Sequence, residues 1–464
     1  MEPRQVSFIV PACGGELVRG SPEQIVRGVC TDSRQIKAGE VFFALRGDKF
    51  DGHDFLQQVA GKAAAVVSER ERVPKVPGDC AVIVVDDTRR ALGRLGGAYR
   101  KDFVLPVIAV GGSNGKTTTK ELIAAALQPS RSTLWSEASY NNDIGVPLTL
   151  LRLDRSHEAA VLEAGTNHPG ELEPLVRMIQ PQFGVITSIG REHLEFFGDL
   201  DGVAKEEGTL GELLPAGGKL LLNGDDPCTN GLAARARAVV VRVGTGERND
   251  WRAHSLRLDS KGVAFYVEAP NAGLSGEYRI QLLGRHQCIN ALFAIALGHE
   301  LGLTRSEIQQ GLEVCKRAKM RLELWEVNGV QVLDDAYNAN VDSMGAALQA
   351  LLDLPCKGRR IAVLGEMAEL GAQSEAAHEE VGKRAADLGI GQLFVVGTMA
   401  SAIARGARAA GLNRVLEFTD VETTAAAVKQ FIKSGDVVLL KASRAARLER
   451  LSDMLRANGS VKKT

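Results

Sequence analysis

Short apolar runs alternate with amphipathic segments along most of the chain. Beyond about residue 101, runs such as LPVIAV, AAVLEAG and FGVITSIG are separated by segments whose apolar positions recur every three or four residues. The first pattern is typical of a buried strand, and the second of a helix with one buried face. Strands that alternate with helices predict an α/β protein with parallel sheets covered on both faces.

The pattern changes twice along the chain and so divides it into three regions. Residues 1–101 carry short strands, such as EVFFALRG and AVIVVDD, that are broken by glycines and charges. Residues 102–316 hold longer apolar runs and one β-patterned stretch at 251–269. Residues 317–464 return to strands such as RRIAVLGEM and GQLFVVG, with helices such as AALQALLDL (346–354) between them. A length of 464 residues fits three domains of ordinary size.

Composition and charge exclude several classes of function. Hydrophobic residues make up 45% of the chain and charged residues 24%, the balance of a folded globular protein. The 56 basic and 57 acidic residues nearly cancel, which gives no electrostatic basis for binding nucleic acid or a membrane surface. No apolar run approaches the ~20 residues of a membrane helix, and the N-terminal sequence lacks the pattern of a secretion signal. Seven scattered cysteines without a CxxC pair predict reduced thiols in a cytoplasmic protein.

The strand LPVIAV leads into a glycine-rich turn, and a helical pattern follows at once. The turn and the residue after it read Gly112, Ser113, Asn114, Gly115, Lys116, Thr117 and Thr118. This G-x-x-G-K-T core belongs to phosphate-binding loops, although Val110 stands where the full motif has a glycine. Glycines let the backbone approach phosphate oxygens, Lys116 can bridge the β- and γ-phosphates of ATP, and the Thr117 hydroxyl can ligate Mg²⁺. The turn predicts an ATP site but leaves kinase, nucleotide-driven switch and ligase open, besides a plain turn with a solvated lysine.

Further motifs, spread over nearly the whole chain, narrow this choice. They are TDSRQIKAGEVFFALRGDKFDGHDF (31–55), GGSNGKTTTKE (111–121), YNNDIGVPLTLLRL (140–153), LEAGTNHPGEL (162–172), TSIGREHLEFFG (187–198), GRHQCINALFAIA (284–296), DDAYNANVDSM (334–344), VLGEMAELG (363–371) and KASRAARLE (441–449). Together and in this order they resemble the Mur ligases, the ATP-dependent amino-acid or peptide ligases of bacterial cell-wall precursor synthesis. DDAYNAN with NNDIGVP is similar to the branch that joins D-alanyl-D-alanine to UDP-N-acetylmuramoyl-tripeptide. Thr166, Gln287, Val341 and Ala442 depart from the residues expected at their positions.

The resemblance implies a three-domain architecture. A small N-terminal α/β domain (1–101) would bind the UDP-sugar, a central P-loop mononucleotide-binding α/β domain (102–316) would bind ATP, and a C-terminal Rossmann-like α/β domain (317–464) would bind D-Ala-D-Ala. The implied reaction is ADP-forming amide ligation through an acyl phosphate, with ATP and Mg²⁺. We expect the third domain to swing and close the site against water, and the chain to act as a monomer on small-molecule substrates.

Five residues are expected to carry the chemistry and the metal. Beside Lys116, the resemblance makes Glu163 a Mg²⁺ ligand together with Thr117, a role that hard carboxylate oxygens suit; a solvated acid at a strand end is the alternative. His193 resembles a histidine that helps to hold a second Mg²⁺, and a packed or capping histidine is the alternative. Lys205 matches the position of a carbamylated lysine in several Mur ligases, and otherwise it is a surface lysine on a polar helix face.

The resemblance assigns the remaining contacts to ATP and the substrates. Asn290 would bond adenine or cap the helix that it opens, Arg321 would reach the ATP phosphates, and Asp335 would accept from ribose hydroxyls. The residues expected at the UDP-sugar and its peptide are Thr31, Ser33, Arg34, Arg46, Asp48, Asn141 and Asn142, a set whose hydroxyls and arginines suit a pyrophosphate. Glu366, Ser443 and Arg444 are expected to line the dipeptide pocket, whereas Asn338 and Asn340 fit a turn equally well.

Two other functions stay open at this point. Another Mur ligase, or a ligase of the folylpolyglutamate type, would add a different amino acid, and DDAYNAN argues against it. A nucleotide-dependent switch without chemistry is disfavoured, because polar residues follow strands in all three regions, where parallel sheets collect their ligands.

Overall fold

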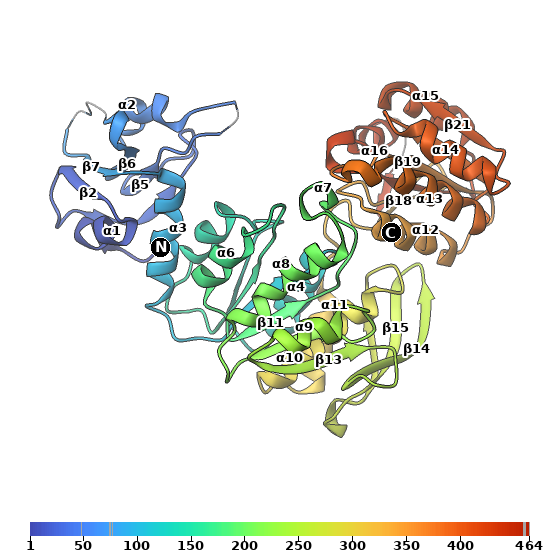
Figure 1. Cartoon of the computed structure of the whole chain (residues 1–464), viewed down its shortest axis with the longest axis horizontal. Helices are drawn as coiled ribbons and strands as arrows, with labels where there is room; N and C mark the ends of the chain where they lie inside the picture. The colour runs from blue at the N-terminus through green and yellow to red at the C-terminus, as the bar shows by residue number, and fades with distance from the viewer. Residues whose placement is uncertain (48, 74–75, 77, 458–460, 464) are drawn as a thin grey trace.

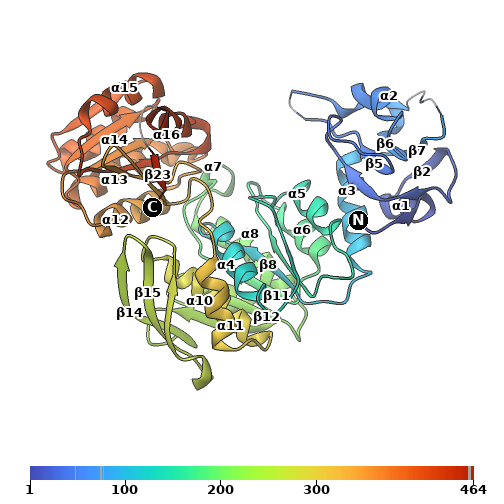
Figure 2. The ribbon, with the colours of Figure 1, turned by 180° about the vertical axis from the view of Figure 1, so that it is seen from behind.

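The N-terminal and C-terminal regions lie at opposite ends of the molecule, with the central region between them (Figures 1 and 2). The structure is a computed structural model that describes residues 1–47, 49–73, 76, 78–457 and 461–463. Each region has its own large sheet. Within these residues, no helix has the length and apolar character needed to cross a bilayer.

The first region is built on a five-stranded sheet in the order β2-β7-β6-β5-β4. Its strands are β2 (Glu16–Arg19), β4 (Gly28–Cys30), β5 (Glu40–Phe43), β6 (Ala65–Glu69) and β7 (Ala81–Val85), and all are parallel except β2. The remaining elements are β1 (Arg4–Gln5), α1 (Val6–Cys13), β3 (Ile25–Val26), α2 (Leu56–Val59) and α3 (Thr88–Arg100). The predicted strands EVFFALRG and AVIVVDD are confirmed as β5 and β7.

The central region carries a nine-stranded sheet in the order β16-β15-β14-β13-β12-β11-β8-β10-β9. Its strands are β8 (Val107–Gly111), β9 (Thr133–Trp135), β10 (Ala159–Glu163), β11 (Phe183–Ile186), β12 (Lys219–Asn223), β13 (Val239–Gly244), β14 (Trp251–Asp259), β15 (Gly262–Glu268) and β16 (Gly276–Ile280). Its helices are α4 (Lys116–Leu127), α5 (Gly145–Leu150), α6 (Leu172–Ile179), α7 (Leu194–Phe197), α8 (Leu200–Leu213), α9 (Thr229–Arg235), α10 (Gln287–Glu300) and α11 (Arg305–Val314).

This central sheet is mixed, which corrects the expectation of a purely parallel sheet. In the order of the sheet, the strands from β9 through β10, β8, β11, β12 and β13 to β14 run parallel. Strand β15 pairs antiparallel with both β14 and β16. A tight turn reverses the chain, because the Asp259 carboxylate accepts hydrogen bonds from Lys261 N and Gly262 N. The β-patterned stretch at 251–269 is therefore a hairpin that extends the sheet.

Both faces of the central sheet are covered. Val107 and Ala109 of β8 belong to one buried cluster and Ile108 and Val110 to another, as alternation along a strand requires. Helices α4, α10 and α11 pack together on the side of the second cluster. The strand thus enters its turn fully buried, and the turn emerges at the carboxyl end of the sheet.

The third region is also an α/β sheet with helices on both faces. Its seven strands have the order β21-β20-β19-β22-β18-β17-β23. The elements are β17 (Glu323–Val327), β18 (Val330–Asp334), α12 (Val341–Asp353), β19 (Arg360–Gly365), α13 (Ser374–Asp387), β20 (Gln392–Val396), α14 (Ala400–Ala409), β21 (Val415–Phe418), α15 (Val421–Phe431), β22 (Val437–Lys441), α16 (Glu449–Arg456) and β23 (Val461–Lys463). Strands β18 to β22 are parallel, and β17 pairs antiparallel with β18 and β23.

One buried cluster continues from the first region into the central region through α3. It contains Ile9, Leu95 and Leu175. Tyr99 donates a hydrogen bond to Leu153 O at 2.7 Å, and the buried Arg100 donates to Ile179 O at 3.1 Å. Helix α3 is therefore part of two regions at once, and the exact boundaries at 101 and 316 stay predictions.

Candidate functional site

The phosphate turn has the predicted strand–turn–helix context. β8 ends at Gly111, α4 begins at Lys116, and Gly112 and Gly115 between them adopt φ of 106° and 88°. A Cβ atom on Gly112 would lie 2.7 Å from Thr187 N, and one on Gly115 would lie 2.8 Å from Asn290 Oδ1. Both positions therefore require glycine, for conformation and for space.

Lys116 lies folded back over this turn. Its Nζ donates hydrogen bonds to the carbonyls of Gly112 and Ser113 and lies 3.7 Å from Glu192 Oε1. Burial alone would lower the pKa of Lys116, but neighbouring carboxylates, Glu192 foremost, raise it overall. The lysine is thus held as a cation at the place where phosphate oxygens would be bound.

Two carboxylates beside the turn were not predicted from the sequence. Burial, reinforced by Glu207, raises the pKa of Glu192 to about 7, although Lys116 acts against it. Glu207 Oε2 accepts a hydrogen bond from Gly112 N at 2.6 Å. Glu192 precedes a histidine in GREHLE and Glu207 follows another glutamate in AKEEG, and neither pattern separates them from solvated acids.

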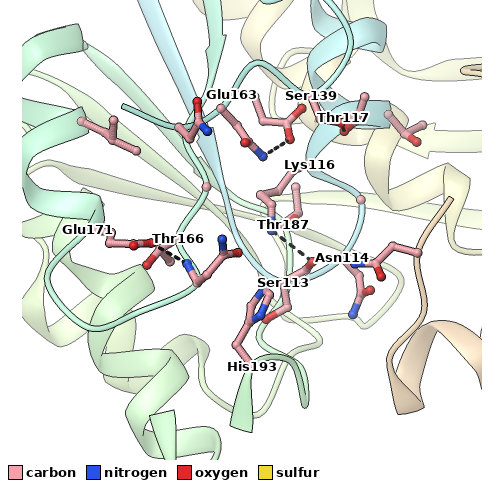
Figure 3. A pocket seen from close by; sticks show the side chains of 18 of the residues that line it. Ser113, Asn114, Lys116, Thr117, Ser139, Glu163, Thr166, Glu171, Thr187 and His193 are labelled. Carbon is pink, nitrogen blue, oxygen red and sulfur yellow. Dashed lines mark hydrogen bonds between the residues drawn. The ribbon is translucent and has the colours of Figure 1, made fainter. Parts of the chain in front are cut away.

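Glu163 lies on the other side of Lys116 from His193 (Figure 3), and Asn141 is hydrogen-bonded to Glu163. The Glu163 carboxylate is 1% exposed at the end of β10, and Asn141 Nδ2 donates to its Oε1 at 2.9 Å. Among the described residues, Glu163 Oε2 finds no hydrogen-bond donor although it is buried. A buried, unpartnered carboxylate oxygen beside a threonine hydroxyl fits a hard divalent cation.

The described residues hold no group of three or more His, Cys, Asp and Glu side chains that could bind a metal by themselves. A Mg²⁺ ion commonly uses one or two protein carboxylates and completes its shell with water and substrate phosphates. Thr117 and Glu163 fit that mode, because both line the cavity on which the turn opens.

Side chains of the third region reach the turn directly. Arg321 donates to Thr117 Oγ1 at 3.0 Å and to Ser139 Oγ at 3.4 Å. Asn340 Nδ2 donates to Asn114 Oδ1 at 3.0 Å. The turn is therefore shared between two regions, and Asn340 takes part in it beyond its role in capping α12.

Another part of the cavity wall combines Asp335 with a lysine that was not predicted. Lys441 ends β22, is 2% exposed, and donates to Asp335 Oδ2 at 2.6 Å and to Asn338 O at 3.0 Å. Asn290 does not cap its helix, since α10 begins at Gln287; instead its Nδ2 donates to Gln287 Oε1 at 2.8 Å. The capping interpretation of Asn290 is thus wrong.

His193 both lines the cavity and bonds to the third region. Its Nδ1 is hydrogen-bonded to the Glu369 carboxylate, and the residue adopts φ of 50° directly before α7. Burial lowers the pKa of His193, and Glu369 only partly opposes this effect. A neutral imidazole with one nitrogen engaged leaves Nε2 available to the cavity.

The cavity has a volume of about 1460 Å³ and joins most of the predicted residues. It is lined by Ser113, Asn114, Gly115, Lys116, Thr117, Thr118, Asn141, Asn142, Glu163, His193, Asn290, Arg321 and Asp335. Ser139 and Lys441 line it as well. Gly112 lies behind the turn, where it meets Glu207.

Lys205 is not among the residues brought together. It lies exposed on α8, whereas Glu206 and Glu207 are buried. Glu206 accepts from Gly170 N and Leu172 N, each at 2.9 Å, and so holds the loop after β10. The helix turns its glutamates toward the site and Lys205 toward solvent, as the surface-lysine alternative requires.

The residues expected at the UDP-sugar lie in the first region, away from the cavity wall. Arg34 is 85% exposed at its side chain and pairs with Asp32 at 2.8 Å, and Arg46 pairs with Glu69 at 3.0 Å. Thr31 and Ser33 flank Asp32 in the segment after β4. Asp48 lies outside the described residues.

The predicted dipeptide residues follow neighbouring parallel strands of the third region. Glu366 comes after β19 and Ser443 after β22, and Ser443 N donates to Glu366 O at 2.9 Å. Ser443 Oγ is buried and, within the described part of the chain, has no partner. Arg444 is exposed and pairs with Glu449 at 3.4 Å. These residues follow the carboxyl ends of neighbouring strands and do not line the main cavity.

Three domain families match consecutive parts of the chain. Residues 25–100 match "Mur ligase family, catalytic domain", residues 110–298 match "Mur ligase middle domain", and residues 320–444 match "Mur ligase, glutamate ligase domain". The UDP-N-acetylmuramoyl-tripeptide–D-alanyl-D-alanine ligase of Bacillus subtilis (strain 168) is 36% identical over 97% of this chain and 97% of its own length. The enzyme of that name from Escherichia coli (strain K12) is 37% identical over 93% of this chain and 94% of its own.

Solved structures agree with this assignment of the fold. A crystal structure of MurF from Acinetobacter baumannii matches with a TM-score of 0.90 at 31% identity, covering 98% of this chain and 99% of that one. A MurF ligase from Thermotoga maritima in complex with ADP matches with a TM-score of 0.82 at 28% identity, covering 93% of this chain and 97% of that one.

Proposed function

The chain belongs to the Mur ligase family, and we propose that it joins D-alanyl-D-alanine to UDP-N-acetylmuramoyl-tripeptide in an ATP-dependent, ADP-forming reaction. Relatives with this activity in their names align over nearly the whole chain. The observation that carries the proposal is the meeting of the phosphate turn, Asn141 and Glu163 in one cavity with Arg321 of the third region. Such a site can bring a nucleotide triphosphate and a carboxylate substrate together.

ATP is proposed to lie with its phosphates over residues 112–118. Backbone N–H groups at the start of α4 and the Lys116 ammonium would bind the β- and γ-phosphates. Lys116 would exchange its bonds to carbonyls of the turn for bonds to phosphate oxygens. The adenosine would extend past Asn290, which lies against Gly115 of the turn, toward Asp335 in the same cavity. ADP in the Thermotoga maritima relative supports nucleotide binding in this fold.

Mg²⁺ is assigned to the Thr117 hydroxyl and the Glu163 carboxylate, because Glu163 Oε2 is a buried acceptor that needs a cation or a donor. His193 Nε2 is the proposed further ligand. When bound, Mg²⁺ shields phosphate charge and so lets two anions approach. Lys205 is given no role, because its side chain is exposed on the far face of α8.

The acceptor is proposed to stretch from the first region to the turn. Thr31, Ser33, Arg34, Arg46 and Asp48 would bind its UDP end. Asn141 and Asn142 would hold the peptide whose terminal carboxylate faces the γ-phosphate. Five basic side chains also line this end of the cavity, namely Arg89, Arg90, Arg94, Lys101 and Arg177, and they suit an anionic ligand.

The reaction needs two displacements. A carboxylate oxygen attacks the γ-phosphorus, the bond to the β,γ-bridging oxygen breaks, and ADP and an acyl phosphate form. The neutral amine of D-alanyl-D-alanine then attacks the acyl carbon, and inorganic phosphate leaves as the amide forms and a proton is released. Lys116 and Arg321 would stabilise the charge that builds up on the phosphoryl oxygens in the first step.

The dipeptide is proposed to enter from the third region. Glu366, Ser443 and Arg444 would line its site, and the buried Ser443 hydroxyl, which has no partner among the described residues, would donate a hydrogen bond to it. A third region held against the turn would also keep water from the acyl phosphate, which hydrolyses readily. We further propose that the enzyme acts as a monomer in the cytoplasm, where its nucleotide substrates are found.

The test is a phosphate-release assay with ATP, Mg²⁺ and UDP-N-acetylmuramoyl-tripeptide, with D-alanyl-D-alanine present or withheld. We expect sustained release only with the dipeptide, and a Lys116→Ala variant that folds normally but shows no turnover. A panel of other amines separates this reaction from that of other ligases. A folded wild-type protein that consumes no ATP with all three substrates present would falsify the proposal.

A further inference from the structure

Lys120 is a fully buried lysine one helical turn beyond Lys116, and the proposed reaction assigns it no role. Its Nζ donates to Ser136 O at 2.7 Å and to Ala138 O at 2.8 Å, and it lies 2.7 Å from Glu121 Oε1. These partners use all three donor hydrogens of the ammonium. Lys120 is absent from the cavity wall, so it acts on the site only through what it holds.

The segment that Lys120 holds carries several groups of the site. It connects β9 with α5, between Trp135 and Gly145. Ser136 Oγ accepts from Glu163 N at 3.1 Å, and Asn141 Nδ2 donates to Glu163 Oε1. Ser139 Oγ lies 3.3 Å from Thr117 Oγ1. The loop therefore touches both proposed Mg²⁺ ligands and presents the asparagines that face the acceptor.

One residue of this loop has an unfavourable backbone conformation. Ala138 has φ of 45°, in the left-handed region that a residue with a Cβ atom disfavours. The Ala138 carbonyl is one of the two that point at Lys120. A buried ammonium that binds two carbonyls of one loop is well suited to keep such a conformation.

We infer that Lys120 is a positioning residue, which sets the acceptor-side loop relative to the phosphate turn. Lys116 and Lys120 lie on the same helix, so α4 fixes both the cation at the γ-phosphate and the position of Asn141. The inference rests on the proposed function, because Asn141 matters only if a carboxylate is placed there. A small displacement of this loop would separate the reacting atoms without removing any group that touches ATP.

The test compares Lys120→Met with the wild-type enzyme. We expect kcat/KM for UDP-N-acetylmuramoyl-tripeptide to fall ~100-fold, the loss typical of a misplaced reacting group, while the dissociation constant for ADP stays unchanged. Lys219→Met is a control for the loss of a paired lysine elsewhere in this region, since the partly exposed Lys219 pairs with Glu300 between β12 and α10, outside the cavity wall. This control should keep full activity.

A double variant separates positioning from general stability. If Lys120 acts through Asn141, the loss in Lys120→Met/Asn141→Ala should be clearly less than the product of the single losses. Independent losses, or an ADP affinity that falls with activity, would show that Lys120 only supports the fold, and wild-type kinetics in Lys120→Met would also overturn the inference.

Lys120→Arg is the second variant, for use if the methionine variant does not fold. Arginine keeps the charge but is longer, so we expect an intermediate loss of kcat/KM for the acceptor with unchanged ADP affinity. Wild-type acceptor kinetics in this variant would contradict the inference. Because the wild-type enzyme is assayed alongside, an inactive wild type would point to failure of the proposed function instead.

Discussion

At the scale of single residues, the buried charges near the site are of two kinds. The lysines are hydrogen-bonded within the protein, whereas two glutamates each have one oxygen without a donor among the described residues. Lys120 and Lys441 are almost fully buried; each is bound by a carboxylate, and Lys120 also by two backbone carbonyls and Lys441 by one. Glu163 and Glu207, by contrast, each keep one buried oxygen without a donor among the described residues. Such an atom costs about 1–3 kcal/mol when it is left unpaired. The two lysines thus find their bonding partners within the protein, whereas Glu163 keeps an oxygen that can still bind a ligand.

Asp436 is a buried carboxylate that is hydrogen-bonded, and the pH dependence of its contribution to stability can be predicted. It is 2% exposed and bonded to Arg359 at 2.6 Å and to Lys433 N at 2.9 Å. Burial acts to raise the pKa of Asp436, but the Arg359 side chain and the backbone donors lower it overall. A lowered pKa in the folded state gives stability that is present above the ordinary value of 3.8 and is lost as pH falls through the lowered value.

We therefore expect Asp436→Asn to lower the melting temperature at pH 7, with a difference from wild type that shrinks below pH 3.8. Calorimetry between pH 7 and pH 3 measures it. Asp387→Asn is the control, because its pair with Lys383 is exposed on both sides and should contribute little. A difference of the same size at all pH values would contradict the linkage.

The element scale explains which parts of the fold could be predicted. Apolar periodicity indicated β8, β10, β19 and β20 correctly, because these strands are buried on both faces. It did not indicate α14, which is rich in small residues and arginines, nor β17, whose sequence ELWEV has glutamates at its first and fourth positions. Helix α12 begins at Val341 rather than at residue 346, because Asn340 and Ser343 form a capping box.

The packing of α13 on α14 gives a prediction at this scale. Their glycines meet the opposite backbone: a Cβ on Gly382 would lie 1.9 Å from Ile403 O, and one on Gly406 would lie 1.9 Å from Glu379 O. Gly382→Ala must push the helices apart, and we expect a loss of about 2 kcal/mol of stability. Gly345→Ala is the matched control, since nothing lies within 4 Å of its Cβ position in α12.

The control should gain roughly 0.5–1 kcal/mol from helix propensity. Denaturant unfolding followed by far-UV circular dichroism compares the two variants. Equal and small effects would mean that the two helices can separate freely.

The site residues divide in the same way into predictable and unpredictable ones. Lys116 is marked by its motif, and Glu163, Asn141 and Arg321 by the family resemblance, and all of them line one cavity. The exposure of Lys205 and the burial of Glu206 and Glu207 could not be predicted, because three consecutive polar residues leave the helix face undetermined. Only the packing of α8 against the turn decides it. Ser139 and Lys441 carry no pattern that distinguishes them from a turn serine and a solvated lysine.

At the scale of the whole molecule, the third region is held against the central one by polar bonds and by an apolar cluster that also includes Leu194 and Leu283 of the central region. Arg321 and Asn340 reach the phosphate turn, and Arg191 binds Glu380 at 2.7 Å and Asp342 at 3.2 Å. The polar contacts are easily exchanged for water, and we expect the arrangement of the regions to change when ligands bind. The same bonds would tighten around a nucleotide that supplies more charge.

We expect small-angle scattering to report this change. The radius of gyration should fall when a non-hydrolysable ATP analogue, Mg²⁺ and the muramoyl-tripeptide nucleotide are added together. Arg191→Ala should raise the radius before ligands are added and should raise KM for ATP several-fold, a loss of about 1 kcal/mol. Arg405→Ala, which loses two carboxylate partners that both lie inside the third region, should leave the profile unchanged.

Identical profiles for wild type with and without ligands would contradict closure. The comparison with Arg405→Ala matters because the two arginines have the same type of partners but differ in whether these partners lie across two regions.

The cluster that runs through α3 has a consequence for anyone who builds hybrids of this enzyme. Swapping the first hundred residues for those of a relative would cut a continuous apolar interior in two, since Leu95 packs in it with Ile9 on one side and Leu175 on the other. A recombinant exchange that aims to alter sugar recognition would need to carry α5 and α6 along with α3. Otherwise the apolar side chains of α3 would come from one protein and those of α5 and α6 from another, and they would not pack together well.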